Sequence, residues 1–283
     1  MKTRIFIPPL PRMTGGISIL YGLAGELVSG GFDAALISME SILPGFPGVV
    51  PGKGVPLEPA GMSEIFIPVI PWKNLELAPD DIWLVPEGWP NALAPGLKAG
   101  ARCVLYAQSA HFLFSALPEG CSMRDLPVSF VAISQPVAWF IEKSVGKRAE
   151  LLRPGIDARV FYPGNERKAA DGIIIAWMPR KNRKMAELTR RILKERNRLG
   201  KNVQWLEIDG CTQVGVAERL RRANVFFSAG YPEGFGLCGL EAMACGARVA
   251  GFAGFGGWDY MRQLLPLDGE CPAVARPCPL DET

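Results

Sequence analysis

The first half of the chain alternates between short apolar runs and stretches with helical spacing. Residues 4–7 form the first apolar run, and residues 33–38 form the second. Between them apolar residues recur three or four positions apart, at Ile17, Leu20, Leu23, Ala24 and Leu27, ahead of a Gly-Gly pair. This spacing predicts an amphipathic helix, and glycine is typical of a helix end. The pattern therefore predicts a strand, a glycine-bearing loop, a helix and a strand, which make one βαβ unit.

Three further apolar runs follow, over residues 81–86, 102–107 and 128–134. Residues 44–62 are rich in Pro and Gly, and we expect them to form an irregular surface segment. Continuously apolar strands that alternate with helices are typical of a parallel sheet covered on both faces. The first half is therefore predicted to be a doubly wound α/β domain.

Turn-forming residues gather around residues 154–165, where we expect the connection between two domains. A second alternation follows. Its predicted strands are residues 172–177, 203–208, 225–229 and 249–252, and its predicted helices are residues 182–198, 214–222 and 237–245. The predicted fold class is α/β with two Rossmann-like domains, 1–160 and 161–283, and a ligand cleft between them.

Composition indicates a folded chain and excludes several classes of protein. Of the 283 residues, 48% are hydrophobic and 21% are charged, which is ample material for buried cores. The net charge of +3 is too small to indicate a nucleic-acid partner. No apolar run approaches the roughly 20 residues that span a bilayer. The N-terminal residues favour a first strand over a signal peptide, so we expect a cytoplasmic protein.

The cysteines and the single histidine argue against a metal centre. The seven Cys residues are scattered without a CxxC pair, and His111 is the only His. An odd number of Cys without a signal peptide is typical of reduced thiols in a cytosol. We therefore expect small buried thiols and no bound metal.

Residues 225–246 carry the most specific chemical signal in the chain. A buried strand leads into a turn with Gly234 and Gly236, and the turn opens a helix that stops at Gly246. The two glycines of the turn allow a ligand to approach the backbone closely. The first N–H groups of a helix lack internal acceptors and lie at the positive end of its dipole. This combination predicts a site for an anion such as a diphosphate.

Two carboxylates flank this predicted anion site. Glu233 lies just before the helix, and Glu241 lies about one turn inside it. A carboxylate would repel a phosphate, whereas it readily accepts hydrogen bonds from hydroxyl groups. The pair therefore suits hydroxyls on either side of a diphosphate, one set on a sugar and the other on a ribose.

The block Pro-Glu-Gly-Phe-Gly-Leu, with Glu233 and Glu241 separated by seven residues, resembles the signature of family 4 glycosyltransferases of GT-B fold. The resemblance implies a retaining, metal-independent transferase that uses a nucleotide-diphospho-sugar and needs no cofactor. It also implies that Glu233 contacts the donor sugar and Glu241 the ribose. The backbone of Phe235, Gly236 and Leu237 would contact the sugar or the diphosphate. Gly15 and Gly16 match the N-terminal glycine loop of these enzymes.

Candidate cations follow the strand at residues 172–177. In this place the family has an Arg and a Lys that neutralise the diphosphate, and cations there would stabilise the leaving nucleotide. The family spacing is one residue longer than Arg180 to Lys184, so the assignment among Arg180, Lys181 and Lys184 stays open. On the acceptor side, His111 and Glu87 each follow an apolar strand and are candidates for contacts with the acceptor or the sugar.

Two alternatives remain open from the sequence. Gly234, Gly236 and Gly239 also fit the GxGxxG fingerprint of NAD- or FAD-dependent enzymes, but no acidic residue stands about 20 positions on at the end of the next strand. Residues 264–283, rich in Pro, do not resemble the family's last elements, so the second domain is expected to be shortened. This favours a non-catalytic relative, or one that needs a partner subunit or a homo-oligomer. The basic residues after 184 are expected to face solvent, and the resemblance leaves a peripheral membrane contact open.

Overall fold

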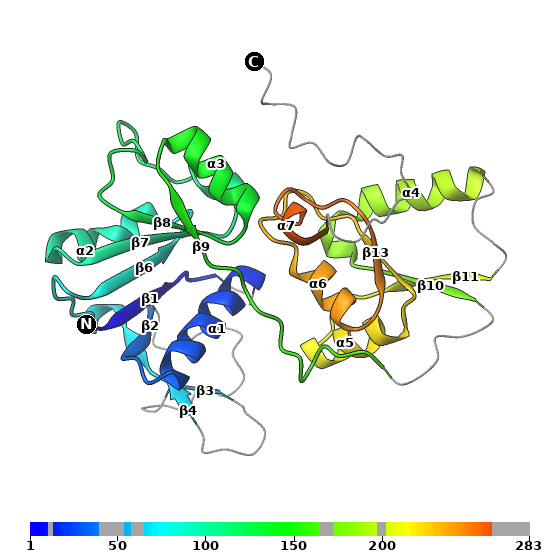
Figure 1. Cartoon of the computed structure of the whole chain (residues 1–283), viewed down its shortest axis with the longest axis horizontal. Coiled ribbons are helices and arrows are strands. Elements are labelled where there is room, and N and C mark those ends of the chain that lie inside the picture. Colours follow the sequence, from blue (N-terminus) through cyan, green and yellow to red (C-terminus); the bar gives the residue numbers. More distant parts are fainter. Residues whose placement is uncertain (11–13, 40–53, 58–64, 165–171, 197–201, 262–283) are drawn as a thin grey trace. The chain divides into compact units, whose positions relative to one another are not determined.

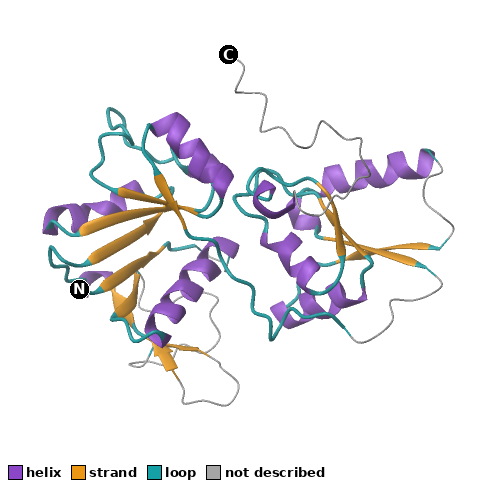
Figure 2. Ribbon diagram, in the orientation of Figure 1, coloured by secondary structure: helices purple, strands orange, loops and turns teal. Residues whose placement is uncertain are grey.

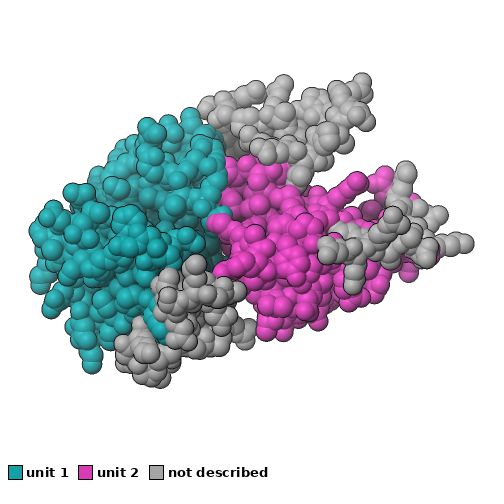
Figure 3. Space-filling model, turned by 60° about the horizontal axis from the view of Figure 1, so that its bottom comes forward, with its two compact units in different colours: residues 1–154 teal, residues 155–283 magenta. Residues whose placement is uncertain are grey.

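The computed structural model describes residues 1–10, 14–39, 54–57, 65–164, 172–196 and 202–261. The chain divides into two compact units, unit 1 (Met1–Pro154) and unit 2 (Gly155–Thr283) (Figure 3). The sequence analysis places this boundary at residue 160. Each unit holds a parallel sheet with helices packed on it (Figure 1), so the predicted α/β class with two Rossmann-like units is confirmed.

The sheet of unit 1 has seven parallel strands in the order β5-β2-β1-β6-β7-β8-β9. The strands are β1 (Thr3–Ile7), β2 (Ala34–Ser38), β5 (Val69–Pro71), β6 (Ile82–Pro86), β7 (Arg102–Ala107), β8 (Ser129–Ala132) and β9 (Ala149–Leu151). The chain builds outwards from β1 to β2 and β5, then returns to place β6 on the other side of β1. The strand order therefore reverses between β1 and β6, which is the topological switch point where doubly wound folds bind ligands.

Among the described residues, three helices and three 3-10 turns connect these strands. They are α1 (Gly15–Ser29), α2 (Ala94–Ala99), α3 (Gln135–Val145), η1 (Trp72–Asn74), η2 (Pro90–Leu93) and η3 (Ala110–Phe112). Figure 2 shows the helices beside the strands. Thr14 caps α1 by accepting a hydrogen bond from the Ile17 amide, and Ser134 caps α3 in the same way through the Val137 amide. Gly15 and Gly16 therefore lie in the first turn of α1, not in a loop before it as the sequence suggested.

The buried core of unit 1 includes a cluster of aromatic rings around Phe6 of β1 and Trp83 of β6. Trp83 is fully buried, and its indole Nε1 donates to the carbonyl oxygen of Ala92 at 2.8 Å. Phe6 packs against Trp83 and also against Trp72 and Trp89, with ring centroids 5.5–6.2 Å apart. Because a buried indole N–H needs a partner, this hydrogen bond fixes the orientation of Trp83 and ties β6 to η2.

The region between β2 and β6 contains strands that the sequence analysis did not predict. β3 (Val55–Leu57) pairs antiparallel with β4 (Ile65–Ile67), and β5 extends the main sheet beside β2. The expectation of an irregular segment over residues 44–62 is therefore wrong for β3. Most of the remaining residues in that range lie outside the described part of the chain. Three-residue strands offer too few positions for a period of two to be recognised.

Unit 2 has a four-stranded parallel sheet in the order β11-β10-β12-β13. The strands are β10 (Ile173–Trp177), β11 (Val203–Glu207), β12 (Val225–Ser228) and β13 (Arg248–Gly251). The helical elements are η4 (Pro179–Lys181), α4 (Arg183–Glu195), α5 (Gln213–Arg222), α6 (Leu237–Ala244) and α7 (Trp258–Met261). The order reverses between β10 and β12, so the loops after these two strands lie at the switch point of unit 2.

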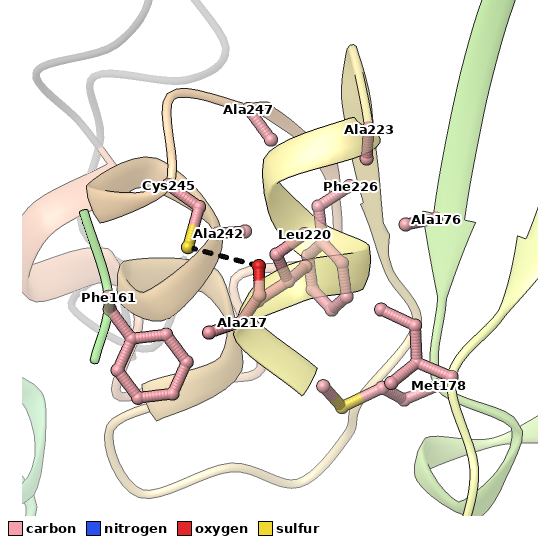
Figure 4. Packing of buried hydrophobic residues seen from close by; sticks show 11 residues of the cluster. Phe161, Ala176, Met178, Ala217, Leu220, Ala223, Phe226, Ala242, Cys245 and Ala247 are labelled. Atoms are coloured by element: carbon pink, nitrogen blue, oxygen red, sulfur yellow. Dashed lines mark hydrogen bonds between the residues drawn. The ribbon is translucent and has the colours of Figure 1, made fainter. Parts of the chain in front are cut away.

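The sheet of unit 2 is covered on both faces. On one face the small residues of α5 and α6 pack against β10 and β12 (Figure 4). There the thiol of Cys245 donates a weak hydrogen bond to the carbonyl oxygen of Ala217 at 3.7 Å, which ties α6 to α5. On the other face Ala186 of α4 packs against Trp177 and Ala229. Ala at the helix contacts allows close packing of α6 against α5 and the sheet.

Within the described residues, no helix is long and apolar enough to cross a membrane.

Candidate functional site

The candidate site of unit 2 is centred on the first turn of α6, at the switch point of the sheet. Gly236 is the N-cap residue, with a left-handed backbone (φ 82°), and no side chain caps this helix. A residue with a Cβ would be strained in that conformation, which explains the glycine. The amides of Leu237 and Cys238 lie where an α-helix offers no internal acceptor. The helix therefore presents unpaired donors and the positive end of its dipole at the end of β12.

Glu233 is held beside this helix start by its own backbone. Its amide donates to the carbonyl oxygen of Gly254 at 2.6 Å, and its carbonyl accepts from the Gly256 amide at 2.8 Å. These bonds form a short parallel bridge to the loop after β13. The Glu233 side chain folds over Gly230, where an added Cβ would lie 2.6 Å from its carboxylate oxygen. The Glu233 carboxylate is therefore held close to the N-terminus of α6.

Lys181 pairs with this carboxylate. The ammonium of Lys181 forms an ion pair with Oε1 of Glu233, and the two side chains are only 28% and 20% exposed. Lys181 is the last residue of η4, the 3-10 turn that follows β10. The two loops at the switch point, after β10 and after β12, therefore contribute the opposite charges of one pair.

Arg180 and Glu241 form a second group of charges at the same helix. The guanidinium of Arg180 lies 4.0 Å from Sγ of Cys238, in the first turn of α6. Glu241 is half-buried one turn further along, and burial raises the pKa of its carboxyl. The positive charges of Arg180 and Lys181 oppose this rise in the Glu241 pKa. Two cations and two carboxylates therefore surround the helix start within electrostatic reach of one another.

Tyr260, on α7, completes the site and was missed by the sequence analysis. Its hydroxyl donates to the carbonyl oxygen of Gly236 at 2.6 Å, and its ring packs against Phe235 with centroids 5.4 Å apart. A Cβ on Gly239 would come within 2.7 Å of this hydroxyl. The position of Tyr260 in the sequence could have indicated its role. It follows the end of β13, and all parallel strands end at the same edge of a sheet.

These residues line one cavity at the carboxyl edge of the sheet. The lining includes Met178, Lys181, Glu233, Gly236, Cys238 and Tyr260. Phe235 points into the protein against Tyr260 and is 5% exposed, so at this position the backbone and not the ring is available to a ligand. Gly234 is buried in the turn, and Leu237 is the first residue of α6. Of these turn residues Gly236 lines the cavity, and the roles predicted for the backbone of Phe235, Gly236 and Leu237 stay predictions.

Lys184 is placed differently from the other candidate cations. It is exposed in the first turn of α4 and is not among the described residues that line the cavity. Asn182, which caps α4, turns the chain between Lys181 and Lys184 with a left-handed backbone (φ 116°). That turn separates Lys184 from the η4 cations, although all three are close in sequence.

The remaining candidates lie in unit 1. Gly16 contacts Gln108, whose side-chain Nε2 donates to the Gly16 carbonyl at 3.1 Å. His111 is exposed on η3, where its ring meets that of Phe112 edge to face at 4.9 Å. Glu87 follows β6 and accepts the Gln108 amide at 2.8 Å. Gly16, Glu87 and Gln108 thus gather at the carboxyl edge of the unit 1 sheet, beside the switch point between β1 and β6.

Within the described residues, no group of three or more His, Cys, Asp or Glu side chains is arranged to hold a metal ion. Independence from a metal or a cofactor stays a prediction.

Known proteins similar to this chain are glycosyltransferases. An α-1,6-glucosyltransferase of Actinobacillus pleuropneumoniae serotype 7 (strain AP76) is 24% identical over 187 residues, which are 65% of this chain and 56% of that protein. The chain thus spans little more than half the length of this relative. No protein-family model matches the chain.

Solved structures show the same fold at low identity. The catalytic domain of starch synthase IV from Arabidopsis thaliana, bound to ADP and acarbose, has a TM-score of 0.57 and 12% identity, with 96% of this chain and 86% of that chain covered. Anabaena HepE in complex with UDP-glucose has a TM-score of 0.53 and 13% identity, with 89% and 80% covered. These neighbours are GT-B glycosyltransferases, and the likeness shows that this chain has the GT-B type of fold.

Proposed function

We propose that the chain is a retaining glycosyltransferase whose unit 2 binds a nucleotide-diphospho-sugar. The observation that carries this proposal is the meeting of Lys181, Glu233 and the first turn of α6 at the switch point of the sheet. Neighbours with the same fold are described with UDP-glucose or ADP bound, and the curated relative is named a glucosyltransferase. The proposal extends these properties to this chain.

The charges divide naturally between the parts of such a donor. Arg180, Lys181 and the α6 amides suit the diphosphate, since cations and helix N-termini both stabilise anions. Glu233 and Glu241 suit hydroxyl groups, because ionised carboxylates accept hydrogen bonds and repel phosphate. In this assignment Glu233 orients the donor sugar and Glu241 binds the ribose. Lys181 exchanges its partner Glu233 for a phosphate oxygen as the donor binds.

The proposed chemistry is a same-face substitution helped by the leaving group. The bond between the anomeric carbon and the diphosphate oxygen breaks, and its electron pair stays on that oxygen. The acceptor hydroxyl oxygen forms the new bond from the same face, and its proton passes to a diphosphate oxygen. Arg180 and Lys181 stabilise the charge that develops on the diphosphate. This route needs no protein nucleophile and retains the configuration of the anomeric carbon.

Binding to a panel of UDP-, GDP-, ADP- and dTDP-sugars tests the donor site. We expect the full-length protein to bind at least one of them, and we expect Glu241→Ala to weaken that binding at least tenfold, the loss typical of a hydrogen bond to a charged group. Glu218→Ala is the matched control, because Glu218 is exposed on α5, away from the cavity. Binding of NAD but of no sugar nucleotide would contradict the proposal.

Transfer to an acceptor tests the catalytic part separately. Incubation with the donor that binds should yield a glycosylated acceptor, or slow release of free sugar by transfer to water, with the α or β configuration of the donor retained. Binding without either product would support a second candidate, a sugar-nucleotide-binding relative without activity.

A further inference from the structure

Two residues of unit 2 have a backbone conformation that is unusual for a residue with a side chain. Among the described non-glycine residues, Asn182 (φ 116°) and Phe255 (φ 85°) alone lie in the left-handed region. This region brings the Cβ atom close to the backbone, which Asn tolerates better than most residues and a bulky residue such as Phe tolerates poorly. Asn182 directly follows Lys181, and Phe255 forms the short parallel bridge with Glu233. The two strained positions therefore adjoin the two partners of one ion pair.

Asn182 is the joint between η4 and α4. Before it, the amide of Lys181 donates to the carbonyl oxygen of Met178 at 3.1 Å and closes the 3-10 turn. After it, the Asn182 side-chain oxygen accepts the Met185 amide at 3.3 Å, and the Asn182 carbonyl accepts the Ala186 amide at 3.2 Å. The Asn182 backbone therefore sets the angle between η4 and α4, and with it the direction in which Lys181 leaves η4.

Both sides of this joint are anchored to the sheet. The guanidinium of Arg183, the first residue of α4, donates to Oε1 of Glu207 at 2.9 Å and lies over the Trp177 ring, 5.5 Å from its centroid. On the η4 side, Met178 is buried in the core of unit 2. A strained residue persists only where its surroundings determine its conformation. The anchored flanks meet this condition, so the fold itself imposes the left-handed backbone of Asn182.

The loop after β13 imposes the second strained position. Glu233 makes two backbone bonds to this loop, with Gly254 and Gly256, and Phe255 is the residue between them. A Cβ on Gly254 would lie 2.7 Å from the Glu233 Cβ. A Cβ on Gly256 would overlap the carbonyl oxygen of Gly234. The loop backbone therefore lies directly against Glu233 and Gly234, and Phe255 takes the conformation that lets both bonds form.

Glycine occupies other left-handed positions of the same region, at Gly236, Gly251 and Gly254. A glycine has no Cβ and so has no strain in this conformation, but it also admits many other conformations. Asn182 and Phe255 therefore cost stability and restrict the backbone more than glycine would. Residues strained in this way gather at functional sites, where a fixed geometry matters more than stability.

We propose that Asn182 and Phe255 are positioning residues of the donor site. Asn182 holds the backbone from which Lys181 extends, and Phe255 holds the backbone of Glu233. The inference rests on the proposed function, in which Lys181 binds a phosphate and Glu233 binds the sugar. Neither positioning residue has to touch the donor. Each restricts one partner of the ion pair in advance, so less conformational freedom is lost when the donor binds.

Asn182→Gly tests the first position. Glycine removes the strain but gives the unfolded chain more freedom, and these opposite effects should leave the Tm within about 2 °C of the wild type. Because glycine lets the turn move, we expect the donor Kd of the full-length protein to rise about two- to fivefold. Asn74→Gly is the matched control, since Asn74 is exposed on η1 in unit 1 and should leave the donor Kd unchanged.

A matched pair of variants tests the second position. Phe255→Asn and Phe255→Gly both remove the ring, but Asn still restricts the backbone and tolerates the left-handed region. The donor Kd of Phe255→Gly should exceed that of Phe255→Asn about two- to fivefold. The Tm values of these two variants should agree within about 2 °C, so a difference in folding cannot account for the difference in affinity.

Combined variants show through which side chain each residue acts. In Lys181→Met, the addition of Asn182→Gly should not raise the donor Kd further, because Asn182 acts through Lys181. In Glu233→Gln, the difference between Phe255→Asn and Phe255→Gly should disappear for the same reason. A purely structural role would leave both effects unchanged in size, because independent changes add. That result would overturn the proposal, and so would a wild-type donor Kd in Asn182→Gly.

Hydrogen–deuterium exchange of the ligand-free protein separates this inference from the proposed function. The Lys181 amide should exchange about two- to fivefold faster in Asn182→Gly than in the wild type. The Glu233 amide should exchange faster by a similar factor in Phe255→Gly than in Phe255→Asn. If these rates change as expected while no sugar nucleotide binds the wild type, the donor assignment alone is refuted. Unchanged exchange rates in both glycine variants would refute the positioning roles, whatever the result of donor binding.

Discussion

The hydroxyl of Tyr260 donates a hydrogen bond to the carbonyl oxygen of Gly236, at 2.6 Å. This bond joins α7, which follows β13, to the N-cap residue of α6. Gly236 has the left-handed backbone that aims the first amides of α6 at the cavity. Burial raises the pKa of the Tyr260 phenol, and the nearby groups Cys238, Glu233 and Glu241 raise it further, so it remains a hydrogen-bond donor at neutral pH. Tyr260 therefore stabilises the backbone conformation of Gly236, and with it the predicted anion site.

Tyr260→Phe should weaken donor binding without unfolding unit 2. The ring contact with Phe235 survives this change, and only the bond to Gly236 is lost. One hydrogen bond contributes about 1 kcal/mol, so we expect about a fivefold increase in the donor Kd. Calorimetric titration with the donor measures it. Tyr162→Phe is the control, because that ring is exposed and stacks under Arg221. Equal donor affinities of Tyr260→Phe and the wild type would show that Gly236 holds its conformation unaided.

Lys181→Met and Lys184→Met should show which of the two lysines binds the donor diphosphate, a question that the sequence leaves open. Lys181 pairs with Glu233 inside the cavity, whereas Lys184 is exposed on α4. Loss of a charge-assisted contact to phosphate costs about 1.5–3 kcal/mol, so Lys181→Met should weaken donor binding about tenfold to a hundredfold. Lys184→Met should change it less than twofold. The binding assay is the same calorimetric titration.

The variant that loses more donor affinity identifies the lysine that binds the phosphates. A larger loss in Lys184→Met than in Lys181→Met would place the phosphates over α4 and would contradict the arrangement proposed for η4. Arg180→Met is informative beside them, because Arg180 lies against Cys238 in the first turn of α6. We expect Arg180→Met to lose about as much donor affinity as Lys181→Met.

The strands and helices of both units were largely predictable because their hydrophobic patterns are long. The helix stripe from Ile17 to Leu27 and the strand–turn–helix of residues 225–246 matched α1, β12 and α6 within a few residues. The short pairing of β3 with β4 was not predictable, since three residues carry no clear period. Where such strands pair depends on contacts between distant parts of the chain.

The candidate site was predictable only where its residues are close in sequence. Glu233, Gly236 and Glu241 lie on one turn and one helix, so their spacing reports their geometry. Tyr260 reaches the same helix from α7, and only the parallel course of β12 and β13 brings it there. The choice of Lys181 over Lys184 depends on the left-handed turn at Asn182, which the sequence does not mark.

Glu241→Gln should stabilise the ligand-free protein at high pH while weakening donor binding. Burial raises the folded-state pKa of the Glu241 carboxyl above its ordinary value of 4.5. The folded state therefore binds this proton more tightly than the unfolded state, and stability is lost as the pH rises from that ordinary value through the folded-state pKa. Gln removes the loss, so the Tm of the variant should exceed that of the wild type at pH 8 and match it near pH 4. Thermal scans at both pH values measure this, with Glu218→Gln as the exposed control. A Tm difference that did not change with pH would contradict it.

Alkylation of Cys238 should be slow and should respond to the charges around it. Burial, with a smaller contribution from Glu241, raises the pKa of the Cys238 thiol from 9.0 to about 11. Only the thiolate reacts, so at pH 8 the reactive fraction is about a hundredfold smaller than for an unperturbed thiol. We expect iodoacetamide to label the exposed Cys121 well before Cys238. Labelling of each cysteine is followed by mass spectrometry of its peptide.

The direction of change in two variants identifies the charges that act on this thiol. Arg180 and Lys181 lower the Cys238 pKa, whereas Glu241 raises it. Glu241→Gln should therefore speed the labelling of Cys238, and Arg180→Met should slow it, with Cys121 unchanged in both. A bound sugar nucleotide should protect Cys238 in the wild type, because its diphosphate would cover the first turn of α6. Slower labelling in Glu241→Gln together with faster labelling in Arg180→Met would mean that access to the thiol, and not its ionisation, controls the reaction, and the positions inferred for Arg180 and Glu241 would then be wrong.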